Sequence, residues 1–541
     1  MKKLLALLLA SVMVFALFAC TQSQGSGEGG GDEITEEMKY GGHLNIASIN
    51  ISGRLDPSNV GGVYHFPNLI WESPLSRDAD GNVAPGVCDF ELSEDQLTLK
   101  LWVIEGKKFH DGTDVEIEDV VASIMRKGHK SPVQYVQGYL AEPISVKDGV
   151  ATLKFSKYSE KTMSYIASTR TLMSVLPKEF CEKYIGVVGV SELPKDQQEG
   201  VVGNNSDVVD AIGTGPYKVD SKRDGEWIKL TRFDGYVKND AKYTGAAAPR
   251  NAYFDSITFW NISDQTASKI QVLANDIDVF SLDMTEYKEQ LPLNHLAQTQ
   301  TLGSKTKFLL FNTKNKNNQI HDDVNLRKAI CAAIDFEEIA AEMWNGLVKL
   351  GGAPAQDGAY YIDTWDKADY MGKANVELAK QYLAKSNYKG EKLYYATTDA
   401  NFAALIESYL KPAGINLDIQ VKESDTEHNT FDGSDWNFTF WQFSAGQTPS
   451  TMAPNSLDRA WDNAEKDAKW ATITSTVPGS DEYMKAWKDL AQIWVDDCAS
   501  PYIGQEMLAW THHEDLVMEY VGTDAYIWNW YWKNPADHAE K

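Results

Sequence analysis

The sequence predicts a mixed α/β protein with two or three domains behind an N-terminal leader segment. Three observations carry this prediction. The chain has 541 residues, which is too long for one hydrophobic core. Its first half contains segments in which apolar and polar residues alternate, as they do in half-buried strands. After residue 300 the pattern changes to strand–helix–strand units, which are typical of α/β domains.

The leader segment has the form of a bacterial signal peptide. Two lysines at positions 2 and 3 precede an almost uninterrupted apolar stretch at residues 4–19. The residues LFAC at 17–20 resemble a lipobox, where the signal is cut and the new N-terminal Cys is acylated, although Phe18 departs from the small or β-branched residue usual there. We therefore expect a signal peptide at 1–19 and a lipidated Cys20. A transmembrane anchor and a plain signal peptide are the alternatives.

A polar segment separates this leader from the body of the chain. The residues TQSQGSGEGGGDE, which follow Cys20, contain no apolar side chain and are rich in glycine, so they cannot contribute to a core. We expect residues 20–38 to be a flexible tether that holds the body outside the cytoplasmic membrane, at the cell surface or in the periplasm. No second apolar run approaches the roughly 18 residues that span a bilayer. Contact with the membrane is then expected through the lipid alone.

Composition narrows the classes of partner and cofactor. The formal net charge of −26 repels nucleic acid and anionic lipid, so no nucleic-acid partner is expected. No cofactor is expected either. The 16 tryptophans include Trp436 with Trp441 and a cluster near the C-terminus. These rings belong either to large cores or to a ligand cleft lined with flat faces.

The cysteines give no metal-binding spacing. Four remain once Cys20 is set aside, and none forms a CxxC pair: Cys88, Cys181, Cys331 and Cys498. No metal site is expected. Disulfides are possible outside the cytoplasm, but the sequence does not reveal their pairing. Cys331 lies in an apolar helical run and is expected to be a small buried side chain.

The individual elements follow from periodicity and from end signals. Strands are expected at LNIAS, SEDQLTLKLWVI, GVATLKFS, FLLFNT, KLYYAT and WNFTFW, and at residues 226–232, 256–262 and 415–421. Helices are expected at residues 114–127, 265–274, 325–335, 337–344, 375–384, 400–410 and 483–495. No internal repeat of fixed period is present.

Four segments of the body, in order, resemble the solute-binding proteins of bacterial ABC importers, specifically the peptide, nickel and oligosaccharide family known as family 5. They are DADGNVAPGV with LSEDQLTLKLWVIEGKKFHDGTDVEIEDVVASI, then DAIGTGPYKV with LTRFDGY, then ITFWNISDQTASKIQVLANDIDVF, and finally FLLFNT with LRKAICAAIDFEEIA. Asn275 stands where the family usually has glycine. The resemblance covers much of the body.

The resemblance implies a periplasmic-binding-protein-like fold of type II, with mixed sheets flanked by helices and a cleft between two lobes. Lobe 1 would be residues 39–297 with an inserted subdomain at about 64–210. Lobe 2 would be residues 298–509, and residues 510–541 would return to lobe 1. The protein would be a monomeric receptor without enzymatic activity that serves an ABC permease and its ATPase subunits. A secreted hydrolase and an adhesive surface protein are the competing interpretations, but no hydrolase motif or repeat supports them.

The residues of these motifs are expected to be structural. Phe109 is predicted to fill the core and His110 to be a turn residue whose hydrogen bonds are satisfied. Asp111-Gly112 and Gly215-Pro216 have tight-turn chemistry. Arg327 and Asp335 are expected in helix packing and at a helix boundary.

Ligand specificity is expected in the loop after WNFTFW. The resemblance implies that peptide-binding members place an Asp three residues after a Trp, where it holds the α-ammonium of the peptide; here Ser444 follows Trp441 at that spacing. A hydroxyl compensates a buried ammonium less well than a carboxylate does. Peptide remains the leading ligand, with oligosaccharide as the alternative and a metal complex as the third. The candidate binding residues are Trp441, Gln442, Ser444 and Gln447, with Ser48, Asn50 and Ser52 in the first loop.

Overall fold

The computed structural model describes residues 34–48, 55–57, 66–127, 136–168, 173–184, 210–262, 264–282, 295–351, 360–364, 367–421, 436–444, 449, 460–521 and 524–540. The chain divides into a unit of residues 1–38 and a body of residues 39–541, which carries every feature described below. Within the described residues, no helix is both long and apolar enough to cross a membrane.

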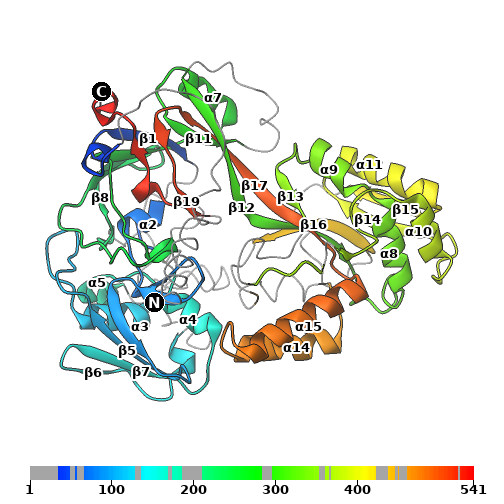
Figure 1. Cartoon of the computed structure of the whole chain (residues 1–541), viewed down its shortest axis with the longest axis horizontal. Coiled ribbons are helices and arrows are strands. Elements are labelled where there is room, and N and C mark those ends of the chain that lie inside the picture. Colours follow the sequence, from blue (N-terminus) through cyan, green and yellow to red (C-terminus); the bar gives the residue numbers. More distant parts are fainter. Residues whose placement is uncertain are drawn as a thin grey trace, which may run out of the picture. The chain divides into compact units, whose positions relative to one another are not determined.

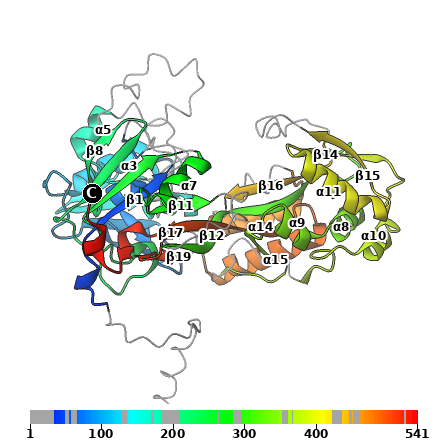
Figure 2. The ribbon, with the colours of Figure 1, turned by 90° about the horizontal axis from the view of Figure 1, so that it is seen from above.

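One mixed sheet of 11 strands forms the backbone of the body (Figure 1). In spatial order its strands are β15 (Asn416–Val421), β14 (Lys392–Thr397), β16 (Phe438–Ser444), β12 (Leu296–Phe311), β17 (Tyr502–His513), β11 (Val279–Leu282), β1 (His43–Ser48), β10 (Ser256–Asn261), β9 (Trp227–Arg232) and β8 (Tyr217–Arg223), with β13 (Val348–Leu350) paired to β17. Figure 2 shows the same sheet from above, with β16 beside β12.

Strands β12 and β17 are the longest in the sheet and lie at its centre. They contain 16 and 12 residues, against the usual five or six, and pair with each other in antiparallel register. The sequence predicted only the last quarter of β12, from Phe308 to Phe311, and did not predict β17. Polar residues such as Gln298 and Thr299 alternate weakly with apolar ones there, so the local pattern of residues 296–306 does not distinguish a strand from a loop.

The first hydrophobic core is built on β12, β14, β16 and the start of β17, and draws on residues from Phe308 to Ile503. Six helices cover it: α8 (Val324–Ala333), α9 (Phe336–Glu342), α10 (Val376–Leu383), α11 (Ala400–Leu410), α14 (Ala464–Ser475) and α15 (Asp481–Asp497). Each begins at an Asp, Asn or Ser whose side chain accepts a backbone N–H of the first turn, which satisfies one of the donors that a helix start leaves open.

The second core combines the early strands with the C-terminal tail. It contains Leu44 and Ile46 of β1, Phe259 of β10, and residues from Trp510 to Trp532. Helix α2 (Phe66–Ile70) contributes to this core, and the tail adds the short strands β18 (Leu516–Val517), β19 (Tyr520–Val521), β20 (Asp524–Ala525) and β21 (Tyr531–Trp532). Helix α7 (Gln265–Leu273) instead buries Val272 in a smaller fourth core with Phe280 and Leu347. Trp528, Trp530 and Trp532 are all buried in the second core, so the C-terminal tryptophan cluster is core packing.

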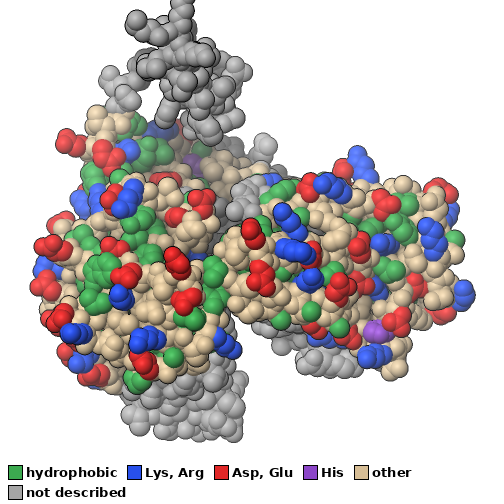
Figure 3. All heavy atoms as spheres, turned by 60° about the horizontal axis from the view of Figure 1, so that its bottom comes forward, with side chains coloured by type: hydrophobic (Ala, Val, Ile, Leu, Met, Phe, Trp, Pro, Cys, Tyr) green, Lys and Arg blue, Asp and Glu red, His purple; other side chains and the backbone are tan. Residues whose placement is uncertain are grey.

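A third core lies under a separate four-stranded sheet. Its strands, in spatial order, are β4 (Cys88–Leu92), β5 (Thr98–Val103), β7 (Val150–Lys154) and β6 (Ser145–Lys147), and β2 (Leu75–Arg77) pairs with β3 (Val83–Pro85) nearby. Helices α3 (Ile117–Lys127), α4 (Glu160–Ile166) and α5 (Lys178–Lys183) accompany it. The Arg126–Asp56 pair, at 2.6 Å, is buried in this region. On the face shown in Figure 3, acidic and basic side chains are interspersed and do not gather by sign.

Candidate ligand-binding site

Parallel strands occur in two groups of the large sheet, and their carboxyl ends define two edges. In one group β1 pairs in parallel with β10 and with β11, so that Ser48 lies opposite Asn261. In the other group β14 pairs in parallel with β15 and with β16. In open α/β sheets, ligands bind outside the carboxyl ends of parallel strands.

The two edges converge on the middle of the β12–β17 pair. Strand β11 runs antiparallel to β17 and ends with Leu282 opposite Ala509. Strand β16 runs antiparallel to β12 and ends with Ser444 opposite Lys305. The carboxyl ends of both groups therefore point toward each other along the two long strands, and we take this convergence as the candidate site.

A large bulge interrupts the β12–β17 pairing at the same place. The register passes from Leu302 opposite Met507 to Thr306 opposite Gln505, so that three residues of β12 lie against Glu506 alone. The side-chain amide of Gln505 donates to the carbonyl of Gly303 at 2.8 Å, which fixes the bulge from within. Bulges bend a strand and increase its twist, and this one places the bend at the candidate site.

Lys307 is a charged side chain of this site that the sequence analysis missed. It is buried, its Nζ donates to Oε1 of Gln442 at 2.5 Å, and the same Nζ lies 5.5 Å from the centroid of the Trp344 ring. Burial lowers the pKa of Lys307, the negative charge of Glu506 acts in the opposite direction, and the positive charge of Lys305 lowers the pKa further. The available signal was a lysine immediately ahead of the apolar run FLLF.

Two adjacent residues that were predicted to bind the ligand, Trp441 and Gln442, lie on opposite faces of β16. Trp441 is half-buried opposite Phe308 and packs against the first core, whereas the exposed Gln442 lies opposite Lys307. Because consecutive strand residues point to opposite faces, Trp441 and Gln442 do not share one surface. Phe308 in turn stacks on Trp494 of α15, with ring centroids 6.0 Å apart.

The remaining predicted residues lie at strand ends or beyond them. Ser444 ends β16 and Ser48 ends β1, at the two converging edges, but their side chains are outside the described part. Gln447, Asn50, Ser52 and the predicted lipidation site Cys20 all lie outside the described residues.

On the β1 side, a hydrogen-bond network orders the strands that lead to the site. Oδ2 of Asp278 accepts the backbone N–H of Asn45 at 2.6 Å, and the Asn45 side-chain oxygen accepts the indole N–H of Trp260 at 3.0 Å. Asp278 immediately precedes β11, so these contacts join β1, β10 and β11. The network therefore fixes the three strands relative to one another ahead of their carboxyl ends.

Four of the motif residues have the structural roles predicted for them. Phe109 is buried in the third core, and Gly112 adopts a φ of +90° that glycine tolerates in the tight turn. Asp335 caps α9, and its side chain accepts the backbone N–H of Glu338. Arg327 packs α8 against the end of α15 through Asp497, at 2.6 Å.

One group of side chains has the composition of a metal site. Among the described residues, only His513, Asp515 and His538 bring three potential ligand atoms within 4.8 Å of one another. Nδ1 of His513 accepts the backbone N–H of Asp515 at 3.1 Å, so the neutral ring carries its proton on Nε2. The ring of His538 stacks on Trp532 at 3.7 Å. A metal bound to Nε2 of His513 would require the ring proton to move to Nδ1, where it would face the backbone N–H of Asp515. This arrangement therefore favours a polar cluster that closes the second core over a metal site.

A family match identifies the class of this protein as extracellular solute-binding. The chain belongs to the family described as bacterial extracellular solute-binding proteins, family 5, whose middle region matches residues 82–466. It is 23% identical to the oligopeptide-binding protein AppA of Bacillus subtilis over 543 residues, with 93% of each chain covered. It is 25% identical over 384 residues to the nickel-binding protein NikA of Staphylococcus aureus, with 69% of this chain and 71% of that protein covered.

Solved structures support the same fold. The substrate-binding protein CtaP of Listeria monocytogenes matches with a TM-score of 0.71 at 19% identity, and the match covers 91% of this chain and 100% of the other. The predicted family and the two-lobed fold are therefore confirmed. Members of this family are binding proteins that work with the permease and ATPase components of ABC importers.

Proposed function

We propose that this protein is the receptor of a peptide importer, which captures an oligopeptide between its lobes and delivers it to a membrane permease. The observation that carries the proposal is the convergence of the two groups of carboxyl ends on the middle of β12 and β17. Lobe 2 would be residues 298–509, and lobe 1 residues 39–297 with the subdomain at about 64–210 and the tail at 510–541. Cys20 would carry the lipid, and the receptor would act as a monomer.

The charges at the middle of the long strands favour peptide over oligosaccharide. Lys307 is buried, while Lys305 and Glu506 are half-buried beside the bulge. A peptide carries a charged group at each terminus, and a charged side chain at this place can bind one of them through a charge-assisted hydrogen bond. A neutral sugar gains nothing from these charges, and its usual aromatic platform is weakened because Trp441 and Gln442 lie on opposite strand faces. The similarity to an oligopeptide-binding protein over 93% of the chain supports the same choice.

A binding screen tests the proposal directly. The mature protein is titrated with di- to nonapeptides, with α- and β-linked oligosaccharides, and with nickel and its histidine complex, and unfolding is followed by thermal shift. A ligand at about 100 times its dissociation constant adds about 2.7 kcal/mol to the free energy of unfolding, which is visible as a rise in Tm. We expect a rise with peptides only. A rise with sugars alone would transfer the receptor role to oligosaccharides, and a rise with none would contradict the proposed ligand class.

A second measurement separates a receptor from a hydrolase. Each peptide that raises Tm is incubated with the protein and analysed by mass spectrometry, and we expect it to remain intact. Cleavage at a rate proportional to protein concentration would contradict the receptor role.

A further inference from the structure

Two cysteines from distant parts of the sequence meet inside the first core. Cys331 lies on α8 and Cys498 directly follows α15, 167 positions later. Their sulfur atoms are 3.7 Å apart, and both side chains are fully buried. A disulfide bond has a sulfur–sulfur length of about 2.05 Å, so the two thiols are in contact and unbonded in this structure.

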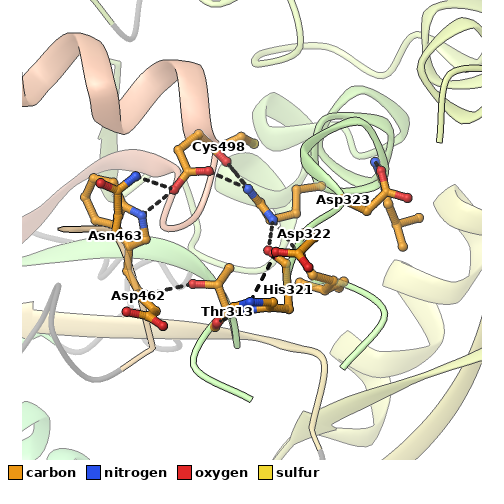
Figure 4. A network of polar contacts seen from close by, with 12 residues as sticks. Thr313, His321, Asp322, Asp323, Asp462, Asn463 and Cys498 are labelled. Atoms are coloured by element: carbon orange, nitrogen blue, oxygen red, sulfur yellow. Dashed lines mark hydrogen bonds and ion pairs between the residues drawn. The ribbon is translucent and has the colours of Figure 1, made fainter. Parts of the chain in front are cut away.

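Contacts that do not involve sulfur hold these two elements together. Arg327 lies one helical turn before Cys331, on the same face of α8. Its Nε and Nη2 donate to the carbonyl oxygen of Asp497 at 2.9 and 2.7 Å, and Nη2 also contacts Oδ1 of Asp497 at 2.6 Å. Figure 4 shows this network beside Cys498. The cysteines are therefore kept within reach of each other before any bond forms.

The backbone at Cys498 also favours a specific role for its side chain. Cys498 ends α15 with φ of +48° and ψ of +39°, in the left-handed region. Helices that end in this way usually place glycine or asparagine there, because a residue with a larger side chain is strained. Cysteine does not relieve this backbone strain as glycine would. The thiol group of Cys498 therefore explains the presence of a cysteine here better than the backbone conformation does.

The other two described cysteines have different surroundings. Cys88 lies on β4 in the third core, and Cys181 lies on α5 with its sulfur 3.6 Å from Oγ of Ser123. Within the described part of the chain, Cys331 with Cys498 is the one pair of thiols in contact. Among the described cysteines, it is therefore the pair that the fold brings together.

We propose that Cys331 and Cys498 form a disulfide bond when the protein folds outside the cytoplasm. The oxidant is a disulfide, carried by a thiol oxidase or by oxidised glutathione. One cysteine, as thiolate, attacks that disulfide and releases one of its sulfurs as a thiol. The second cysteine, also as thiolate, attacks the mixed disulfide and releases the other. Two protons leave the protein, and its two electrons reduce the oxidant to two thiols.

The bond would form before the core closes. Burial raises the pKa of the Cys331 thiol, so little thiolate is present in the folded protein. Once formed, the bond is out of reach of soluble reductants for the same reason. It would join α8 to the segment that leads into β17, and so would fix the lobe 2 end of one of the two long strands.

Site-resolved thiol labelling of the full chain tests this pairing. The secreted protein is denatured and alkylated with a light reagent, then reduced and alkylated with a heavy one, so that mass spectrometry reports each cysteine separately. We expect heavy label on Cys331 and Cys498, light label on Cys88 and Cys181, and a linked peptide before reduction. Light label on all four would overturn the proposal. Refolding in a glutathione buffer repeats the test without export, so a failure of export is distinguishable from a failure of pairing.

Variants separate a bond from simple packing. For Cys331→Ala and Cys498→Ala we expect Tm to fall by roughly 5–10 °C relative to the oxidised protein, with no further response to a reductant. Unfolding in the presence of a reductant should lower Tm in the unaltered chain but not in these variants. The Cys88→Ala, Cys181→Ala double variant is the matched control and should keep the linked peptide. A Tm of the unaltered chain that does not depend on reductant would contradict the bond.

Discussion

The imidazole of His110 joins two segments that are far apart in the sequence, because its Nε2 donates to the carbonyl oxygen of Gly215 at 3.0 Å. The same ring accepts the backbone N–H of Gly213 at Nδ1, and its own backbone N–H donates to the Gly213 carbonyl at 3.0 Å. Phe233 packs edge-on against the ring with centroids 5.1 Å apart. The KFHDG and GTGPY segments thus bind each other, so both are needed to position the third core against the second.

This contact predicts a loss of stability in mild acid. Burial lowers the pKa of His110 to about 4, although the Gly215 carbonyl and the negative charge of Glu72 raise it in part. In the unfolded chain the pKa is about 6.5, so between pH 6.5 and 4 the unfolded state binds a proton that the folded state does not. The stabilisation is complete above pH 6.5 and is lost as pH falls toward 4, by roughly 3 kcal/mol in total.

Urea denaturation at pH 7.5, 6, 5 and 4 measures this effect. In His110→Gln we expect a lower free energy of unfolding at pH 7.5 and a shallower decline with acid than in the unaltered chain. Equal slopes for both proteins would contradict the assignment to His110. Burial also lowers the pKa of His43 and His512, so some decline is expected to remain in the variant.

The end of α7 predicts how position 275 responds to substitution. Asn275 follows the helix with φ of +62° and is exposed, and its N–H donates to the carbonyl of Val272 at 3.1 Å. We expect Asn275→Gly to change the free energy of unfolding by less than about 0.5 kcal/mol. Asn275→Val should lose about 1–2 kcal/mol, because a β-branched residue is strained in the left-handed region. Chemical denaturation of the three proteins checks the order, and an unaffected valine variant would disprove the argument.

The buried Arg126–Asp56 pair predicts a large cost for removing one partner. Two nitrogens of Arg126 donate to the two oxygens of Asp56, at 3.0 and 2.6 Å. We expect Asp56→Ala to lower the free energy of unfolding by roughly 3–5 kcal/mol, since it leaves an uncompensated buried cation. The exposed Lys100–Glu91 pair is the matched control, and Glu91→Ala should cost no more than about 1 kcal/mol. Similar losses in both variants would show that burial does not decide the effect.

Replacing Lys307 should weaken ligand binding without lowering the stability of the protein. Methionine is close to lysine in shape and removes the charge together with the hydrogen bond to Gln442, and replacing a buried charge by an apolar side chain costs little, so Lys307→Met should leave Tm within a few degrees of the unaltered protein. If the charges at the bulge bind the peptide, its dissociation constant should rise at least tenfold, as measured by isothermal titration calorimetry. A variant with a preserved Tm and an unchanged dissociation constant would remove Lys307 from the binding site.

Helices with local end signals were predictable from the sequence, and the long strands were not. Helix α11 has the predicted bounds because Asp399 caps it and its apolar residues recur on one face. Helix α3 starts at Ile117 and not at Asp114, since Asp114 pairs with Lys108 in an isolated bridge. Strands β12 and β17 depend on pairing between residues about 200 positions apart, and no local pattern contains that information.

The sequence predicted the strand that carries part of the candidate site, but it did not predict which side chains share a surface there. The sequence predicted β16 as a strand, and its two-residue period already implies that Trp441 and Gln442 face opposite ways. Lys307 could not be identified as a site residue, because its position opposite Gln442 depends on the register between β12 and β16. The same register places Ser444 beside Lys305.

The contribution of the C-terminal tail to the second core constrains the order in which the two cores can form. Among the described residues, the first core draws only on those between Phe308 and Ile503, so this core can condense as soon as that continuous segment is available. The second core needs Leu44 near the beginning together with Trp528, Trp530 and Trp532 near the end. The second core must therefore wait for the last part of the chain to be synthesised, so the first core can close in a nascent chain well before the second.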